Sequence, residues 1–388
     1  MKSFYRILKK EYKKVINNKF ILFILLLAPL IFSAVVIWTF SKGVATDLPV
    51  AVVDNDNSDL SREISRMIDA TSGCAVKYKI ADIEQGHNLI KKGSVYALIV
   101  IPRDFKKDLN RSQKPQIVYY YNNQAILIGG VITKDVQSAV LTVMSGVNAQ
   151  IQMKKGLPKD VVLSKINLIR VDEHIKANPY LNYSYFLTYA ALAHVFQVFI
   201  TFLAIWSVGI EFKEGTIRKS LKLADDSIIV LAFAKMTFYA VIFLIQMLIV
   251  YGYYILVYGA PFDGNLLFCL LSTIAFIFSY ESMGIAFVSV LSNLRFALSA
   301  GAFYTSLGFT MAGMTFPAIA MPSFGQMYSA LLPVRPFVNL LVDQSMKGLD
   351  VVYDIKYLFW ILLIFLLGIS LLPLLKKHAK DESLWYQI

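Results

Sequence analysis

Long apolar runs alternate with short charged connections along much of the chain, and this pattern predicts helices that cross a membrane. A bilayer core about 30 Å thick needs about 20 consecutive, mostly apolar residues in helical form. Six stretches reach or approach this length: residues 20–40, 185–209, 228–258, 266–291, 296–316 and 357–375. We therefore expect an α-helical membrane protein with six transmembrane helices. The first occupies 20–41, and five more lie within 185–376.

Residues 42–184 show a different pattern, in which short strand-like runs alternate with helical ones. The predicted strands and helices, in chain order, are 48–54, 58–70, 75–80, 82–92, 95–101, 115–121 and 125–155. Alternation of this kind is typical of a compact α/β domain. We predict that such a domain is inserted between the first and second spans.

Two features of this domain have a functional and a structural interpretation. The run from Tyr119 to Tyr121 can be a ligand surface or a strand with one buried face. Asp54, Asp56 and Asp59 resemble a calcium loop only loosely, because Asp59 stands where the loop needs glycine. We favour the structural interpretation in both cases, with a turn and a helix cap at the aspartates.

Composition supports a membrane location. The chain is 57% hydrophobic and 16% charged, with a mean hydropathy of +0.57, whereas soluble domains carry about 25% charged residues. The net charge is +12, but its distribution indicates membrane topology. Basic residues crowd segment 1–19, the connection after the second span and the tail at 377–388, while the turn at 259–265 has none. By the positive-inside rule both termini face the cytoplasm, in the plasma or inner membrane, and nucleic acid is not an expected partner.

Catalytic and metal-binding motifs are absent from the sequence. It contains no G-x-x-x-x-G-K-[ST] phosphate loop, no H-E-x-x-H and no Cys-x-x-Cys, and its four histidines are scattered. Cys74 and Cys269 lie in regions of different character, so a disulfide between them is not expected. We expect no catalytic residue, metal or cofactor in this chain.

The segment 211–223 carries the most informative pattern. Its apolar residues fall near one side of a helix and its charged residues on the others, which predicts a short amphipathic helix at the membrane interface. Glu211, Gly215 and Thr216 resemble the E-x-x-x-G-T stretch of the permease subunits of ABC type-2 exporters, with Lys213 near the basic position of that motif. The similarity extends to the whole layout, including an extracytoplasmic domain after the first span and a proline-marked region of short outer helices at 317–355.

This resemblance implies a half-transporter. In that family the short helix couples to a separate ATP-binding subunit, which holds ATP and magnesium, and two permease copies or paralogues pair in the bilayer. The residues that would contact or position the ATPase subunit are Glu211, Lys213, Glu214, Gly215 and Thr216. The structural alternative is an interfacial loop in which Gly215 only permits a bend.

Polar residues inside the spans are candidates for a transport pathway or for pairing between helices. Glu281 lies deep in the fourth span, where an ionised carboxylate is costly without a partner, and we expect it to pair with Lys235. Further candidates for such a pathway are His194, Gln197 and Gln246.

Small residues in the fifth span permit close helix approach, either in a dimer seam or within one subunit: Gly301, Gly308, Ala312 and Gly313.

Together these features predict the membrane subunit of an ATP-driven exporter. Its substrate is drug-like, lipid, peptide or glycan, and no residue selects among these classes. One alternative is an ion-driven secondary transporter with Glu281 as proton carrier. Another is a membrane-anchored receptor or scaffold that acts through its outer domain.

Overall fold

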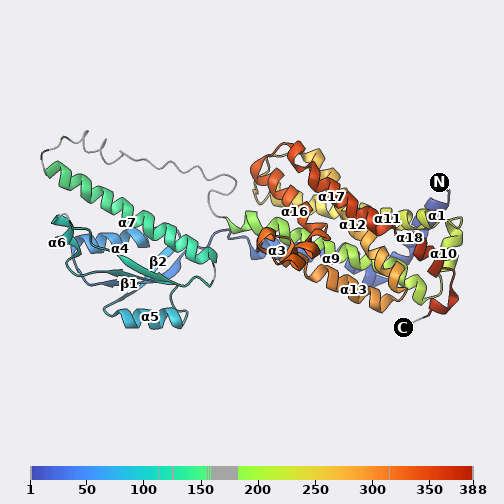
Figure 1. The fold of residues 1–388 in the computed structure, drawn as a ribbon, viewed down its shortest axis with the longest axis horizontal. Helices are drawn as coiled ribbons and strands as arrows, with labels where there is room; N and C mark the ends of the chain where they lie inside the picture. Colours follow the sequence, from blue (N-terminus) through green and yellow to red (C-terminus); the bar gives the residue numbers. More distant parts are fainter. Residues whose placement is uncertain are drawn as a thin grey trace. The chain divides into compact units, whose positions relative to one another are not determined.

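The chain forms two units, which are described separately here. The computed structural model describes residues 2–111, 113–124, 126–154, 156, 158, 182–313 and 315–386. One unit, the α/β unit, comprises Val44–His174. The other, the helical unit, comprises Met1–Gly43 together with Ile175–Ile388 (Figure 1).

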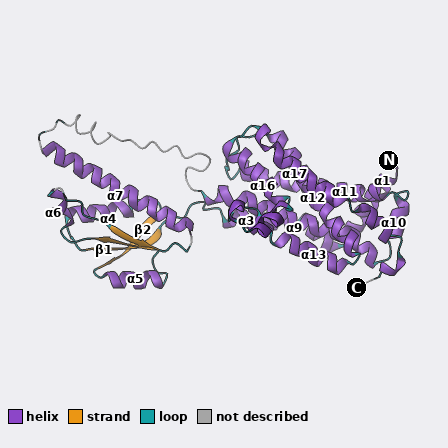
Figure 2. Ribbon diagram, viewed as in Figure 1, coloured by secondary structure: helices purple, strands orange, loops and turns teal. Residues whose placement is uncertain are grey.

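A four-stranded sheet forms the centre of the α/β unit, in the order β2-β1-β3-β4. Strands β1 (Leu48–Asp54), β2 (Cys74–Ile80) and β3 (Ala97–Ile101) are parallel, and β4 (Val118–Tyr121) runs antiparallel at the edge. Helices α4 (Asp59–Asp69) and α7 (Ile126–Lys154) cover one face and α5 (Ile83–Lys91) the other (Figure 2). A short helix, α6 (Phe105–Asn110), follows β3. Every strand and helix predicted for this region is therefore present.

The aspartate cluster of the α/β unit is a turn with a helix cap. Asp54 accepts hydrogen bonds from the backbone of Asp56 and Asn57 at 3.1 and 2.9 Å. Ser58 caps α4 and forms a reciprocal capping box with Ser61, whose hydroxyl also donates to Asp54 at 2.7 Å. The structural interpretation is confirmed because the carboxylate is already occupied by protein donors.

The helical unit begins with three helices in series, α1 (Lys2–Asn17), α2 (Lys19–Leu26) and α3 (Ala28–Thr39). Its central helices are α9 (Tyr183–Lys213), α11 (Ile228–Leu256) and α12 (Leu266–Leu291), and the short helix α10 (Ile217–Leu223) joins α9 to α11. The remaining helices, in chain order, are α13 (Leu294–Ser306), α14 (Gly308–Met311), α15 (Ser323–Ala330), α16 (Val334–Val342), α17 (Val351–Ile369) and α18 (Leu372–His378). A π-helix, Asp343–Lys347, follows α16, and single 3-10 turns lie at Ala318–Ala320 and Glu382–Leu384. The short helices expected within 317–355 are thus present.

Six helical stretches in the described residues are long and apolar enough to cross a membrane. Five coincide with predicted spans: Lys19–Thr39, Tyr183–Lys213, Ile228–Leu256, Leu266–Leu291 and Val351–His378. The sixth is Leu127–Met153 in α7, whose buried face packs on the sheet of the α/β unit.

The fifth predicted span, 296–316, differs from expectation because it is divided. Helices α13 and α14 meet at Leu307 and end at Met311. At the break the carbonyl of Thr305 accepts a hydrogen bond from the Gln197 side chain at 3.2 Å. A side chain that inserts into the backbone ladder in this way is a common cause of a helix kink.

The first span is also broken, just before Pro29. Pro29 has no N–H, which leaves the carbonyl of Leu25 without its usual helical donor. The side-chain amide of Gln246 on α11 donates to the carbonyls of Leu25 and Leu26 at 2.8 and 3.1 Å. This contact assigns Gln246 a structural role between α11 and the first span.

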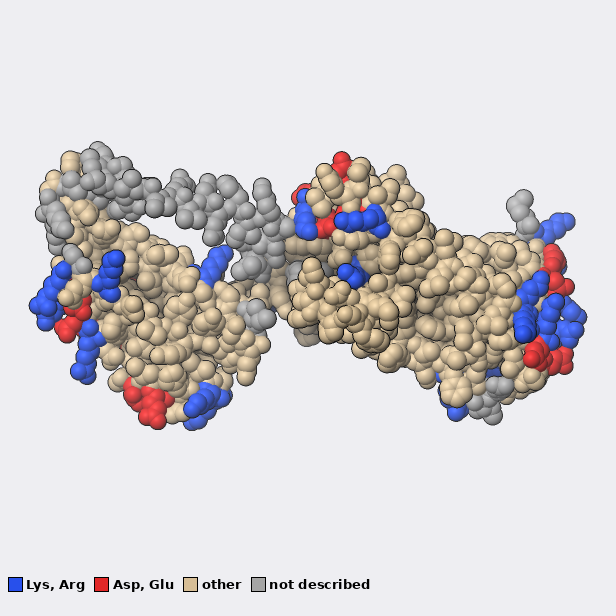
Figure 3. Space-filling model, in the orientation of Figure 1, with Lys and Arg blue, Asp and Glu red and all other residues tan. Residues whose placement is uncertain are grey.

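Charged side chains gather at two places on the helical unit, with a broad uncharged band between them (Figure 3). One lies at the end with α1 and α10, and the other near the short helices around α16. Large apolar residues such as Phe20, Leu248 and Phe359 are exposed on helices within the band. This distribution suits a bilayer around the band.

Candidate functional site

Helix α9 ends in a left-handed turn built from the residues of the E-x-x-x-G-T motif. Gly215 has a φ of +65°. Its N–H donates to the carbonyl of Phe212 at 3.1 Å, and the N–H of Thr216 donates to the carbonyl of Glu211 at 2.8 Å. These two bonds form a Schellman motif, which favours glycine because the residue must adopt positive φ. Glu211, Gly215 and Thr216 are therefore spaced as a helix C-terminus requires. This agrees with the structural alternative, in which Gly215 permits a bend.

The short helix α10 is amphipathic, as predicted, although it begins only at Ile217. Its inner side, with Ile217 and Leu221, is buried in an apolar cluster that also contains Ile7 of α1. Its outer side exposes three bases, Arg218, Lys219 and Lys222. Residues 211–213 belong instead to the last turn of α9, so Glu211 is not on the short helix.

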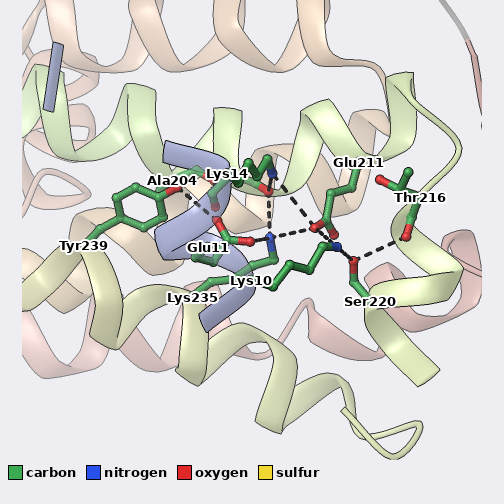
Figure 4. A network of polar contacts seen from close by, with 10 residues as sticks. Lys10, Glu11, Lys14, Ala204, Glu211, Thr216, Ser220, Lys235 and Tyr239 are labelled. Atoms are coloured by element: carbon green, nitrogen blue, oxygen red, sulfur yellow. Dashed lines mark hydrogen bonds and ion pairs between the residues drawn. The ribbon is translucent and has the colours of Figure 1, made fainter. Parts of the chain in front are cut away.

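Beneath this turn lies a buried ion cluster in which Lys235 of α11 bridges two carboxylates (Figure 4). Its Nζ is 2.6 Å from Oε1 of Glu11 on α1 and 3.1 Å from Oε1 of Glu211 on α9. All three side chains are at most 1% exposed. The other carboxylate oxygen of Glu11 accepts a hydrogen bond from Tyr239 at 3.0 Å. The cluster thus connects α1, α9 and α11 through charges removed from water.

Two further lysines of α1 extend this cluster. Lys10 lies 2.7 Å from Oε1 of Glu211 and also donates to the hydroxyl of Ser220 on α10. Lys14 lies 3.9 Å from the same Glu211 oxygen and donates to the backbone carbonyl of Ser207 at 3.0 Å. Glu211 therefore attracts three cations from two helices, and Lys10 connects it to the coupling helix α10 (Figure 4).

Lys14, which lies outside the membrane-spanning segments, has a lowered pKa. Burial, followed by repulsion from Lys235, lowers the pKa of Lys14 to about 8. Its ammonium also stands 4.7 Å from the ring centre of Trp206, which stabilises the charged form in part.

Exposed ion pairs connect the same end of the unit at its surface. Arg6 of α1 pairs with Asp225 after α10 at 3.1 Å, and Arg218 pairs with Glu382 near the C-terminus at 2.8 Å. The ring of Tyr386 stands against Gly215, and its backbone N–H donates to the carbonyl of Phe212 at 3.1 Å. Exposed pairs contribute little stability, but they place both chain ends beside the α9–α10 turn.

The expected pair between Glu281 and Lys235 is wrong. Lys235 pairs instead with Glu11 and Glu211. Glu281 is 1% exposed, and neither of its carboxylate oxygens has a hydrogen-bond partner among the described residues.

Sequence reasoning missed Glu11, although a signal was present. Ile7, Glu11 and Val15 recur every four residues and form the buried stripe of α1. A single acid within an otherwise apolar stripe of a basic helix indicates a buried partner of positive charge.

The other polar candidates lie in separate places. Gln197 accepts a hydrogen bond from Tyr280, and its amide nitrogen lies 2.5 Å from Nδ1 of His194. Gln246 contacts the first span, as described above. These contacts join helices locally, and they do not gather His194, Gln197, Gln246, Lys235 and Glu281 into one site.

Two of the small residues of the fifth span, Gly301 and Gly308, face α9 of the same chain. A Cβ on Gly301 would approach Ile205 to 2.4 Å, and one on Gly308 would approach Gln197 to 2.3 Å. Ala312 is buried, and Gly313 has a φ of +88° at the end of α14. The close approach that Gly301 and Gly308 permit is thus intramolecular.

Taken together, the apolar helices and the amphipathic helix between two of them define a multi-pass membrane protein. The family model described as ABC-2 family transporter protein matches residues 19–372, and the chain belongs to this family. It is the membrane component of a transporter. A search of curated proteins found no match.

Proposed function

We propose that the chain is the permease subunit of an ATP-driven exporter and that a separate ATP-hydrolysing subunit docks on α10. The observation that carries this proposal is the position of α10. It joins α9 to α11 through short turns and exposes Arg218, Lys219 and Lys222, while its inner side rests on the buried ion cluster.

Force applied to α10 would reach three helices at once. The Schellman turn joins it to α9, residues 224–227 join it to α11, and Lys10 joins it to α1. Because Glu211 is 1% exposed, we assign it the role of fixing this geometry. The exposed residues Lys213 and Glu214 are better placed to contact the partner.

Several finer features of the proposal follow from the charge distribution and the family. Both termini and α10 face the cytoplasm, and the α/β unit lies outside the cell. ATP and magnesium bind the partner subunit, and a second permease copy or paralogue completes the transporter. The cargo is a drug-like, lipid, peptide or glycan molecule.

The test is charge reversal on the exposed face of α10. Lys219→Glu should lower ATPase stimulation and co-purification of the ATP-binding subunit by about tenfold, because one close charge pair contributes about 1.4 kcal/mol or more. Lys13→Glu is the matched control, since Lys13 is exposed on α1 and is not on α10. Equal ATPase stimulation in both variants and the native complex would contradict docking at α10.

The ion-driven alternative is favoured by one observation: the carboxyl group of Glu281 is buried and has no hydrogen-bond partner among the described residues. Glu281→Gln keeps the shape of the side chain and removes its titratable carboxyl group. Under the ATP-driven proposal, transport by this variant stays within about twofold of native. Transport that survives ATP depletion, stops when the proton gradient collapses and is lost in Glu281→Gln would establish the alternative.

A further inference from the structure

A pocket of about 360 Å³ lies between α16 and α17, at the end of the helical unit opposite the ion cluster. Arg335, Asn339, Lys356, Tyr357 and Trp360 line it. It therefore combines two cations and an amide with two aromatic rings. Pockets of a few hundred Å³ suit small ligands or the headgroup of a larger one.

The two cations of this pocket form no salt bridge among the described residues, although Lys356 interacts electrostatically with Asp354 at longer range. Neither Arg335 nor Lys356 has a carboxylate within 4.0 Å in the described part of the chain. Among the described residues, the guanidinium of Arg335 donates one hydrogen bond, to the hydroxyl of Ser329 at 3.3 Å. A guanidinium has five N–H donors, so most of its capacity remains available to a ligand.

Two acids near this pocket, Asp343 and Asp354, already contact side chains outside the pocket lining. Asp343 pairs with Lys347 at 2.5 Å, and Asp354 accepts a hydrogen bond from Gln344 at 2.7 Å. The charged side chains that line the pocket are Arg335 and Lys356, so the pocket favours an anion.

The aromatic wall of the pocket points to an amphiphile. The indole N–H of Trp360 donates to the carbonyl of Ala330 at 2.6 Å, which fixes the ring between α15 and α17. Trp360 and Tyr357 begin the long apolar stretch of α17, and tryptophan and tyrosine prefer the membrane boundary. An anionic headgroup held by Arg335 would thus have its apolar part beside the surface that lipid tails contact.

We propose that this pocket binds the phosphate headgroup of an amphiphile at the membrane boundary. Arg335 forms paired hydrogen bonds to the phosphate oxygens, Lys356 supplies a second positive charge, and the two rings pack against the beginning of the tail. This inference does not depend on coupling to an ATPase.

The test is lipid binding to the purified full-length chain, measured by native mass spectrometry. The probes are dioleoyl phosphatidic acid, dioleoylglycerol, which has the same tails without phosphate, and inorganic phosphate. We expect saturable binding of phosphatidic acid and about tenfold weaker binding in both Arg335→Gln and Lys356→Gln, because each removes a charge-assisted contact. Dioleoylglycerol binding should not change, and inorganic phosphate should bind more weakly than phosphatidic acid.

Lys42→Gln is the matched control, because Lys42 is exposed and lies outside the pocket lining. Equal binding of phosphatidic acid by the native chain and by both pocket variants would overturn the proposal. Lys356→Gln removes an exposed side chain, so its result does not depend on whether Arg335→Gln folds.

The phosphate amphiphile can be a resident membrane lipid or the cargo, and a second measurement separates these sources. The reconstituted transporter is given ATP and fluorescent phosphatidic acid in one leaflet. Loss of ATP-driven transfer in Lys356→Gln supports cargo at this pocket. A resident lipid is supported if transfer is unchanged in Lys356→Gln and if a membrane lipid co-purifies with the native chain but not with this variant. A failure of ATP coupling alone would leave the binding result intact.

Discussion

At the scale of single residues, Lys235 is the centre of the buried ion cluster. Its ammonium and the carboxylates of Glu11 and Glu211 are at most 1% exposed, so none of the three can be hydrated if a partner is lost. The removal of one member of a buried pair typically costs about 3–5 kcal/mol, because the remaining charge is left unpaired.

Lys235→Met should therefore destabilise the helical unit by about 3–5 kcal/mol. The double variant Glu11→Gln/Lys235→Met should be more stable than the sum of its single changes predicts, because the two residues share one interaction. Thermal unfolding of the solubilised chain measures both effects, with Lys42→Met as the exposed control. Additive losses would show that the pair contributes nothing as a pair.

A second residue-scale prediction concerns pH. The pKa of Lys14 is lowered to about 8, so between pH 8 and its unfolded value near 10.5 the unfolded chain binds more protons at this site. The contribution of Lys14 to the free energy of unfolding should thus rise with pH across that interval. Below pH 8 the cost of burying its charged form should be fully present. The measurement is the melting temperature of the native chain minus that of Lys14→Met, from pH 7.5 to 10. A difference that stays flat or falls would contradict the lowered pKa.

At the scale of secondary-structure elements, the helix ends and breaks of this protein follow from where backbone groups find partners. Pro29 leaves a carbonyl that Gln246 satisfies, and Gln197 occupies the carbonyl of Thr305 at the α13 break. Gly215 ends α9 because its positive φ lets Thr216 bond back to Glu211. The α9–α10 turn is therefore a defined joint.

Gly215→Ala tests the rigidity of this joint. Left-handed φ costs a residue with a Cβ about 1–2 kcal/mol, and the new Cβ would also collide with the Tyr386 ring. Tyr386→Ala in the same chain should relieve the collision and leave the backbone cost, so the double variant should be more stable than Gly215→Ala alone. The readouts are thermal stability and ATPase stimulation. If Gly215→Ala alone leaves both unchanged, the turn is not a constraint on the proposed coupling.

At the scale of the whole molecule, the proposed function requires a definite sidedness. The bases of α1 and α10 lie at one end of the helical unit, whereas the α/β unit is inserted after the first span. Positive charge on the cytoplasmic side of a membrane would place α10 within reach of an ATPase.

Accessible cysteines can test this sidedness. In intact cells a membrane-impermeant maleimide should label Lys92→Cys in the α/β unit and should label Lys222→Cys on α10 only after permeabilisation. Background labelling should be low, because Cys74 and Cys269 are buried and burial raises the pKa of Cys74 to about 11. Labelling of Lys222→Cys in intact cells would contradict the proposed orientation.

The sequence by itself determined the elements whose signal is local or periodic. Spans were found because about 20 consecutive apolar residues have few alternative structures. Strands were found because a short β-branched run between turn residues also has few alternatives. The amphipathic character of α10 and a helix cap beside the aspartates of the α/β unit were predicted for the same reason, since helix periodicity and capping depend only on neighbours along the chain.

Only the tertiary structure decided which polar residues meet. Glu11 and Lys235 are 224 residues apart, and Glu281, the partner expected from the sequence, is chemically just as suitable. The division of the fifth span likewise depends on Gln197 from another helix. Pairing between buried charges is set by the packing of helices distant in sequence, and no periodicity along a single helix encodes the identity of its neighbour.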